Sequence, residues 1–128
     1  MGGEVVEDKP RIFFKTYVDD AIHSGLIGDM GAERWQTLCV LASFMDDRGV
    51  CYPSQDMIAR RLNVARETAN RRIRSLLKYK WQGRALVTMH KHRDPAIQAW
   101  RNSVYTIYPI TGLQFGNRDQ QVDVSVTL

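Results

Sequence analysis

Residues 52–79 read YPSQDMIARRLNVARETANRRIRSLLKY, and the rest of the chain is organised around them. Ser54 is a good N-cap, because its hydroxyl can accept a hydrogen bond from an otherwise unpaired backbone N–H. We predict a first helix over about residues 55–61 and a turn at Asn63, a residue that tolerates a left-handed backbone. A second helix then runs from about residue 65 to residue 79. This arrangement predicts a helix-turn-helix.

The second helix is expected to be amphipathic. Its apolar residues recur at steps of three and four and form one stripe: Ala69, Ile73, Leu76 and Leu77. At about 100° per residue, the polar residues on the opposite side or beside it are Glu67, Asn70, Arg71, Arg74 and Lys78. A recognition helix needs this division, because one face packs on the other helices while the other reaches base edges and phosphates in the major groove.

Positive charge is concentrated in the same part of the chain. Residues 60–84 contain nine Lys and Arg against one acid, Glu67, a net charge of +8, whereas the whole chain carries +4. The rest of the chain is therefore net −4. A concentrated basic patch binds a polyanion where the same charge spread out need not. The plainer alternative is a pair of amphipathic helices with ordinary solvated basic faces.

A longer pattern carries a resemblance to a known family: Ser54-Gln55-x-x-Ile58-Ala59-x-x-Leu62-x-Val64-x-Arg66-x-Thr68-Ala69-x-x-x-Ile73-x-x-Leu76. It resembles bacterial winged-helix regulators over about residues 32–108. With its flanks, the chain looks most like the N-terminal DNA-binding domains of replication initiators from Gram-positive plasmids and phages. One departure is Ala65, where the family usually has Ser. Since Ala cannot cap, the start of that helix must rely on backbone, water or Asn63.

The sequence on both sides predicts the remaining elements of the domain. Residues 32–46 carry an apolar helical pattern and are expected to form the first of three core helices. A short strand is predicted at residues 50–52, a turn at 81–84, and a long hairpin whose strands span 85–92 and 103–108. The predicted fold is therefore α+β: a winged helix with a three-helix core, a small antiparallel sheet and a long wing.

Residues 1–31 are expected to form an N-terminal extension. Within it, residues 11–15 predict a strand or arm that docks on the core, and residues 16–24 a short helix. The aromatic pair Phe13 and Phe14 exceeds what three core helices need, and initiators of the resembled family often pair on repeated sites. We therefore predict a homodimer formed through this extension.

Residues 109–128 are expected to form a C-terminal tail or a linker to a missing domain. The alternation of apolar and polar residues at 122–128 could add a strand. The abrupt end predicts a fragment of a longer protein. The resemblance implies that a missing C-terminal domain would recruit host replication proteins.

Composition bounds the class of protein. A chain of 128 residues that is 44% apolar and 25% charged is ordinary for one globular domain. No apolar run approaches the roughly 18 residues of a membrane span, and the acidic residues 1–11 lack a hydrophobic signal region. The two cysteines, Cys39 and Cys51, do not make a disulfide framework. A reducing cytoplasm and no membrane partner are expected.

The sequence offers little for catalysis or metal binding. His90 and His92 flank Lys91, which would repel a cation, and the cysteines and histidines lack zinc-finger spacing. No phosphate loop of the GxxxxGK[ST] type is present. The adjacent acids Asp46 and Asp47 would point in different directions on a helix. We expect no cofactor, no metal and no enzyme.

The predicted function is sequence-specific binding of double-stranded DNA, which by resemblance would be at the repeats of a replication origin. The residues predicted to read bases are Arg66, Glu67, Asn70, Arg71 and Arg74. Those predicted to contact phosphates are Ser54, Gln55, Thr68, Lys78, Lys91, Arg93 and Arg101. Two alternatives stay open: a transcriptional regulator that binds an operator, and a winged helix used for protein–protein assembly.

Overall fold

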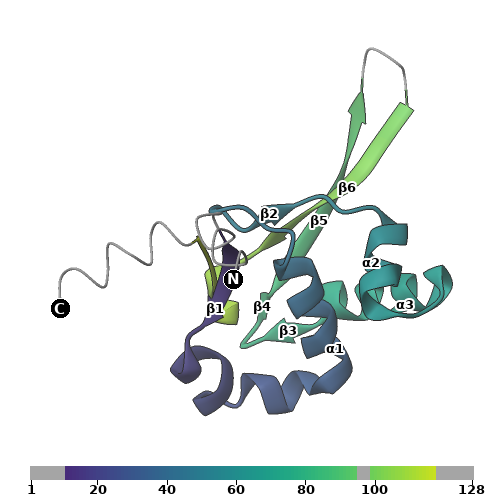
Figure 1. Cartoon of the computed structure of the whole chain (residues 1–128). Coiled ribbons are helices and arrows are strands. Elements are labelled where there is room, and N and C mark those ends of the chain that lie inside the picture. The colour runs from purple at the N-terminus through teal and green to yellow at the C-terminus, as the bar shows by residue number, and fades with distance from the viewer. Residues whose placement is uncertain (1–10, 95–98, 118–128) are drawn as a thin grey trace, which may run out of the picture.

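The computed structural model describes residues 11–94 and 99–117, and for residues 92–94 and 99–102 it describes the backbone alone. Three helices form the core of the domain: α1 (Leu26–Ala42), α2 (Gln55–Leu62) and α3 (Arg66–Lys78). Figure 1 shows them grouped on one side of the molecule, with the long β5–β6 hairpin projecting from it. None of the described helices is both long and apolar enough to cross a membrane.

Three strands complete the winged helix. They are β2 (Val50–Cys51), β5 (Val87–Asp94) and β6 (Ala99–Ile107), and they pair antiparallel in the order β2-β6-β5. The chain therefore runs through two helices of the core and the recognition helix, with β2 between α1 and α2, before it enters the hairpin. This succession confirms the predicted α+β winged helix. The hairpin strands differ from the predicted 85–92 and 103–108 in their bounds.

The first core helix was predicted over residues 32–46. The element α1 (Leu26–Ala42) consists of two helical segments that meet at a kink at Gly31 (φ 86°, ψ 164°), so a helical segment does begin directly after Gly31, as predicted. That segment ends at Ala42, four residues earlier than predicted, and a short helical segment that contains Gly28 precedes the kink. Leu26 and Met30 are buried in the core, and their burial holds this early turn in place in spite of the glycines.

After α1 ends, the chain forms a turn that the Asp46 side chain stabilises. The Asp46 carboxylate accepts hydrogen bonds from the backbone N–H groups of Arg48 (2.9 Å) and Val50 (3.0 Å). These bonds and the neighbouring Arg48 cation lower the pKa of Asp46. A carboxylate that binds backbone donors ahead of it in this way favours a turn over a further helical turn.

The helix-turn-helix formed as predicted. The Ser54 hydroxyl accepts from the backbone N–H of Met57 at 3.1 Å, which caps α2. Asn63 adopts the left-handed conformation (φ 57°, ψ 47°), and the N–H of Val64 closes the end of α2 on the carbonyl of Ala59 at 3.0 Å. Ala65 offers no side-chain cap for α3, and its carbonyl accepts a hydrogen bond from the N–H of Ala69 at 3.0 Å in the first turn of the helix.

Substituting Ser54 by Ala is expected to lower the free energy of unfolding by about 1 kcal/mol, because the N–H of Met57 loses its partner at the start of α2. The change is measured by urea denaturation. Ser43→Ala is the matched control, because its exposed hydroxyl bonds only to a carbonyl of its own helix end, that of Val40. An equal, negligible effect of both substitutions would contradict the capping role.

The core lies between the three helices and the inner face of the sheet. Its largest fully buried side chains come from every one of these elements: Leu26, Met30, Thr37, Leu38, Leu41, Cys51, Ile58, Leu76, Leu86, Val87, Tyr105 and Thr111. The helices α2 and α3 are in contact, and each contributes a small buried residue to the core, Ala59 and Ala69. The stripe predicted for α3 therefore faces inward, and its opposite face is left to solvent.

The N-terminal extension belongs to the same body. Strand β1 (Ile12–Thr16) pairs antiparallel with β7 (Leu113–Asn117), and Figure 1 shows this ribbon on the side of the molecule away from α3. Phe14 packs against the core, and the ring of Phe13 lies so close to Gly116 that a Cβ there would stand 2.6 Å from it. The aromatic pair from which a homodimer was predicted is thus used within the chain.

The remaining connections are short. A π-helical turn, η2 (Asp19–His23), precedes α1, and a 3-10 turn, η3 (Pro109–Thr111), precedes β7. Strands β3 (Lys80–Trp81) and β4 (Arg84–Ala85) form a tight hairpin after α3, where a turn was predicted. Its turn residues Gln82 and Gly83 both have positive φ, 54° and 79°, as a two-residue hairpin requires. The strand predicted at residues 122–128 lies outside the described residues.

Candidate nucleic-acid interface

The exposed face of α3 is the most prominent candidate for a binding surface. Its exposed side chains are Glu67, Arg71, Arg74 and Lys78. The residues on the opposite side are buried: Ala69, Leu76 and Ile73, of which Ile73 is 3% exposed. The helix is anchored by its apolar stripe against α1 and α2, so the polar face is presented on a fixed support. This is the division of faces that the sequence predicted.

The cations of this region differ in what holds them. Arg72 lies against α1 and forms an ion pair with Glu33 at 3.2 Å, and the guanidinium of Arg61 lies 5.7 Å from the centre of the Phe44 ring. By contrast, Arg71 and Arg74 form no ion pair with any other described residue. Their charge is therefore available to a ligand.

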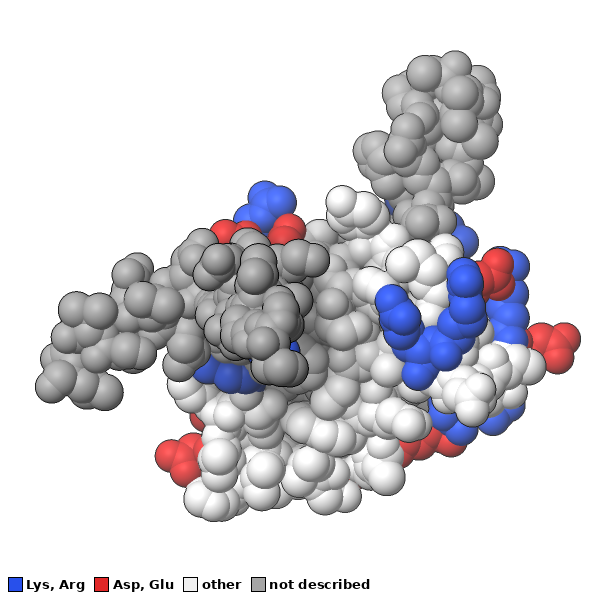
Figure 2. All heavy atoms as spheres, viewed as in Figure 1, with Lys and Arg blue, Asp and Glu red and all other residues white. Residues whose placement is uncertain are grey.

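Figure 2 shows the Lys and Arg side chains gathered over the part of the surface where Figure 1 places α2 and α3, with acidic side chains at the margin. Six of the cations on α2 and α3 are exposed: Arg60, Arg61, Arg66, Arg71, Arg74 and Lys78. A surface of this kind attracts phosphate-rich polymers.

Two residues predicted to read bases lie on the α2 side of α3. Arg66 is exposed and pairs with Asp56 at 3.4 Å, also at the surface. An exposed pair of this kind is worth at most about 1 kcal/mol, so it can open when DNA approaches. Asn70 is half-buried, and its Oδ1 atom is buried without a hydrogen-bond partner among the described residues. Asn70 therefore lies deeper than its neighbours on the exposed face.

The residues predicted to contact phosphates divide into three groups. Lys78 on α3 and Lys91 on β5 are exposed. Ser54, Gln55 and Thr68 are half-buried near the starts of α2 and α3, where Ser54 also serves as the cap. For Arg93 and Arg101 the structure describes only the backbone: they belong to the paired part of the wing, in which Arg93 is opposite Trp100.

The structure adds a cation that the sequence did not single out. Arg34 comes from α1 and lies beside α3, where its Nε atom donates to the Ser75 hydroxyl at 3.1 Å. It lines a hollow of about 360 Å³ together with Arg71, Arg74, Ser75, Lys78 and Tyr79. No local signal marks Arg34, because it meets this surface only through the packing of α1 on α3.

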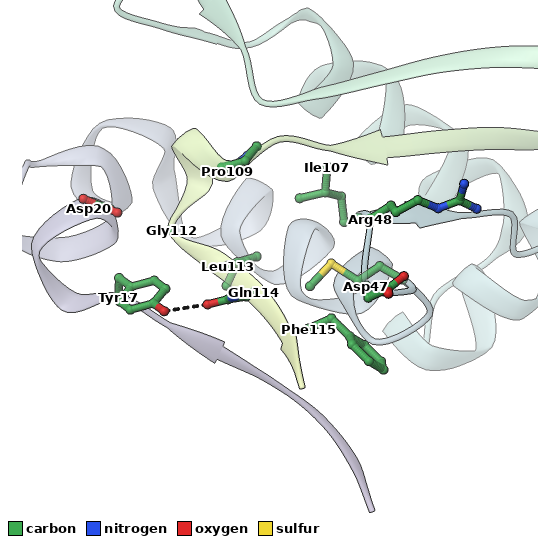
Figure 3. Close-up of a pocket in the computed structure, with 12 residues that line it drawn as sticks. Tyr17, Asp20, Asp47, Arg48, Ile107, Pro109, Gly112, Leu113, Gln114 and Phe115 are labelled. Atoms are coloured by element: carbon green, nitrogen blue, oxygen red, sulfur yellow. Dashed lines mark hydrogen bonds between the residues drawn. The ribbon is translucent and has the colours of Figure 1, made fainter. Parts of the chain in front are cut away.

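A second hollow lies away from α3. Figure 3 shows it between the β1–β7 ribbon and the turn before β2, with a volume of about 370 Å³. Its charged lining residues are Asp20, Asp47 and Arg48, and the Tyr17 hydroxyl donates to Gln114 at its rim. Neither a histidine nor a cysteine is among the residues that line it.

The two cysteine thiols are not activated as nucleophiles. Burial raises the pKa of Cys51 to about 12 and also raises that of Cys39, so neither is an activated thiolate at neutral pH. Within the described residues, no group of three or more His, Cys, Asp or Glu side chains is placed to hold a metal ion.

Comparison with known proteins identifies the same segment. A family model described as a helix-turn-helix domain matches residues 37–81, which run from the second half of α1 through α2 and α3 to β3. No curated protein and no solved structure matches the chain. The match covers α2 and α3 with the predicted base-reading residues, but neither Arg34 nor the wing, and it indicates DNA binding.

Proposed function

We propose that this domain binds a specific sequence of double-stranded DNA by inserting α3 into the major groove. The observation that carries the proposal is the exposed face of α3, on which Arg71 and Arg74 form no ion pair with other described residues. An α-helix fits the width of the major groove, and its exposed side chains can then reach base edges. The role is one of binding, without catalysis or cofactor, in the cytoplasm.

The chemistry of this face suits readout of guanine, cytosine and adenine in the major groove. Arg71 and Arg74 can each donate two hydrogen bonds to guanine, whereas Glu67 can accept from the amino group of cytosine. Asn70 suits adenine, and its side chain would have to rotate outward to bring the Oδ1 atom, which is buried in the free protein, to the adenine amino group. Arg66 reaches DNA when its pair with Asp56 opens.

Contacts on either side of α3 would fix the domain on the duplex. Lys78 and Lys91 are exposed cations on α3 and on β5, and the N-terminal ends of α2 and α3 bring Ser54, Gln55 and Thr68 near the same surface. Such contacts to phosphates set position and orientation but do not read sequence. The wing, with Arg93 and Arg101, would extend the contact along the neighbouring backbone.

Affinity for duplex DNA is expected to fall steeply with salt. Each phosphate neutralised releases counterions and contributes about −0.9 to the slope of log affinity against log salt. With several unpaired cations on this surface, we expect a slope of about −3 or steeper, measured by fluorescence anisotropy from low to physiological salt. A flat response would reject DNA binding and favour the alternative in which the winged helix assembles with another protein.

The biological site is proposed by resemblance. We propose repeats of a plasmid or phage replication origin, with a further domain that engages host replication proteins. A transcriptional regulator built on the same domain is the second candidate, and it would use the same face of α3. Footprinting on the DNA that surrounds the gene discriminates between them: protection of repeats within an origin supports initiation, and protection of one operator beside a promoter supports regulation. Homodimer formation on repeated sites stays a prediction.

A further inference from the structure

The hollow between α1 and α3 is built around one immobilised guanidinium. Arg34 donates from Nε to the Ser75 hydroxyl and from Nη1 to the carbonyl of Met30, both at 3.1 Å. The guanidinium also lies over the Tyr79 ring, 5.1 Å from its centre. These contacts come from both helices and fix its orientation, although the side chain is only half-buried.

The Tyr79 ring, over which the Arg34 guanidinium lies, is itself fixed by a hydrogen bond to α1. The Tyr79 hydroxyl donates to the carboxylate of Asp29, and burial and this bond raise the pKa of Tyr79 to about 12, so the hydroxyl keeps its proton at neutral pH. Asp29 lies on the segment of α1 before the kink at Gly31, and Arg34 lies after it. Both segments of α1 therefore contact the C-terminal end of α3, one through Asp29 and the other through Arg34.

The fixed guanidinium still has donors to spare. A guanidinium carries five N–H groups, and the contacts to Ser75 and Met30 use two of them, which leaves three without a partner among the described residues. The hollow that it lines also contains Arg71, Arg74 and Lys78, and no acidic residue. Four cations around one hollow repel one another in the free protein, and an anion seated among them removes that cost.

We propose that this hollow holds one phosphodiester group of the DNA backbone, bound by Arg34 from α1 and Lys78 from α3. This inference rests on the proposed function and adds a contact from α1, outside the recognition helix. The pre-oriented guanidinium of Arg34 can bind two phosphate oxygens together, and Lys78 supplies a point charge. Arg71 and Arg74 also line the hollow, and as exposed side chains they can turn toward bases, so the seated phosphate sets the register in which they read.

Substituting each cation by a neutral residue tests whether Arg34 and Lys78 bind the same phosphate. Arg34→Gln and Lys78→Gln are each expected to weaken cognate and scrambled duplexes equally, by roughly tenfold. Each is also expected to reduce the salt slope, by at most about 0.9 because the two cations share one phosphate. Arg34→Lys keeps the charge and is expected to retain the slope with weaker binding. The matched control is Arg48→Gln, an exposed arginine in the turn before β2 that lines the other hollow and should leave both quantities unchanged.

Ethylation interference locates the phosphate on the duplex. Ethylation removes the charge of one phosphate at a time, and in the wild type it is expected to block binding strongly at one position. Binding by Arg34→Gln and by Lys78→Gln should both become insensitive to that same position. Sensitivity lost at different positions, or retained by both variants, would overturn the proposal.

Folding and function are separated by two further measurements. Melting temperatures show whether Arg34→Gln is destabilised, and Lys78→Gln, an exposed substitution, keeps the test decisive if Arg34→Gln does not fold. An unchanged salt slope in both variants, with a lower melting temperature for Arg34→Gln, would assign Arg34 a purely structural role and leave DNA binding standing. Failure of the wild type to bind any duplex would instead reject the proposed function and this inference with it.

Discussion

Replacing Ile73 by Ala is expected to lower the free energy of unfolding by about 2–5 kcal/mol. Ile73 lies at the centre of the buried stripe of α3, is 3% exposed, and belongs to the core cluster shared with α1, α2 and the sheet. Truncation removes apolar surface from the core and leaves a cavity, because the surrounding helices are fixed by their other contacts. The change is measured by thermal and urea unfolding of the whole chain.

The matched control lies on the same helix and faces the other way. Arg71 is exposed and forms no ion pair with other described residues, so Arg71→Ala should change stability by no more than roughly 0.5 kcal/mol. DNA binding by Ile73→Ala should be lost only as far as the fold is lost, and it should return below the melting transition. If Arg71→Ala melted the domain while Ile73→Ala did not, the two faces of α3 would be assigned the wrong way round.

The second large effect concerns recognition. Arg71→Ala is expected to weaken binding to the cognate duplex by about 1–3 kcal/mol more than to a scrambled duplex, because a guanidinium can make two hydrogen bonds to one guanine. Arg74→Ala is expected to act in the same way. The double substitution need not be additive, since the two residues are neighbours on one helix face. Affinities for the footprinted site and its scrambled version measure the difference.

Lys78→Gln is the control for charge in this experiment. It removes one cation from the same face of α3, and as a phosphate contact it should weaken both duplexes equally. If Arg71→Ala also weakens both duplexes equally, Arg71 reads no base and instead contacts the phosphate in the hollow that it lines. If Arg74→Ala still discriminates in that case, base readout belongs to the other residues of the face.

The sequence by itself determined the helix-turn-helix and its two faces. The Ser54 cap, the left-handed Asn63 and the stripe that contains Ile73 are local features, because each acts over a few residues of one helix or turn. The missing cap at Ala65 was visible in the same way. These signals do not depend on the rest of the chain, and the family match to residues 37–81 covers the same segment.

Only the tertiary structure decided that the chain just before Gly31 is also helical. The sequence predicted a helix from residue 32, and α1 does kink at Gly31. Gly28 inside a helix costs about 1 kcal/mol relative to alanine, which disfavours a helix before that point. The burial of Leu26 and Met30 against the rest of the core outweighs that cost and holds a short helical segment in front of the kink. Tertiary structure also decided the pairing of β1. Its partner β7 lies about a hundred residues further along the chain, and the Phe13 ring needs the space left by Gly116.

The hollow between α1 and α3 is also a product of tertiary packing. Arg34 and Ser75 are 41 residues apart in sequence, and Asp29 and Tyr79 are 50 apart. No period or motif connects residues at such distances, because side chains on two helices meet only when the apolar faces of those helices have packed. The sequence thus determined which face of α3 carries the charge, and the packing of α1 decided which further cation stands beside it.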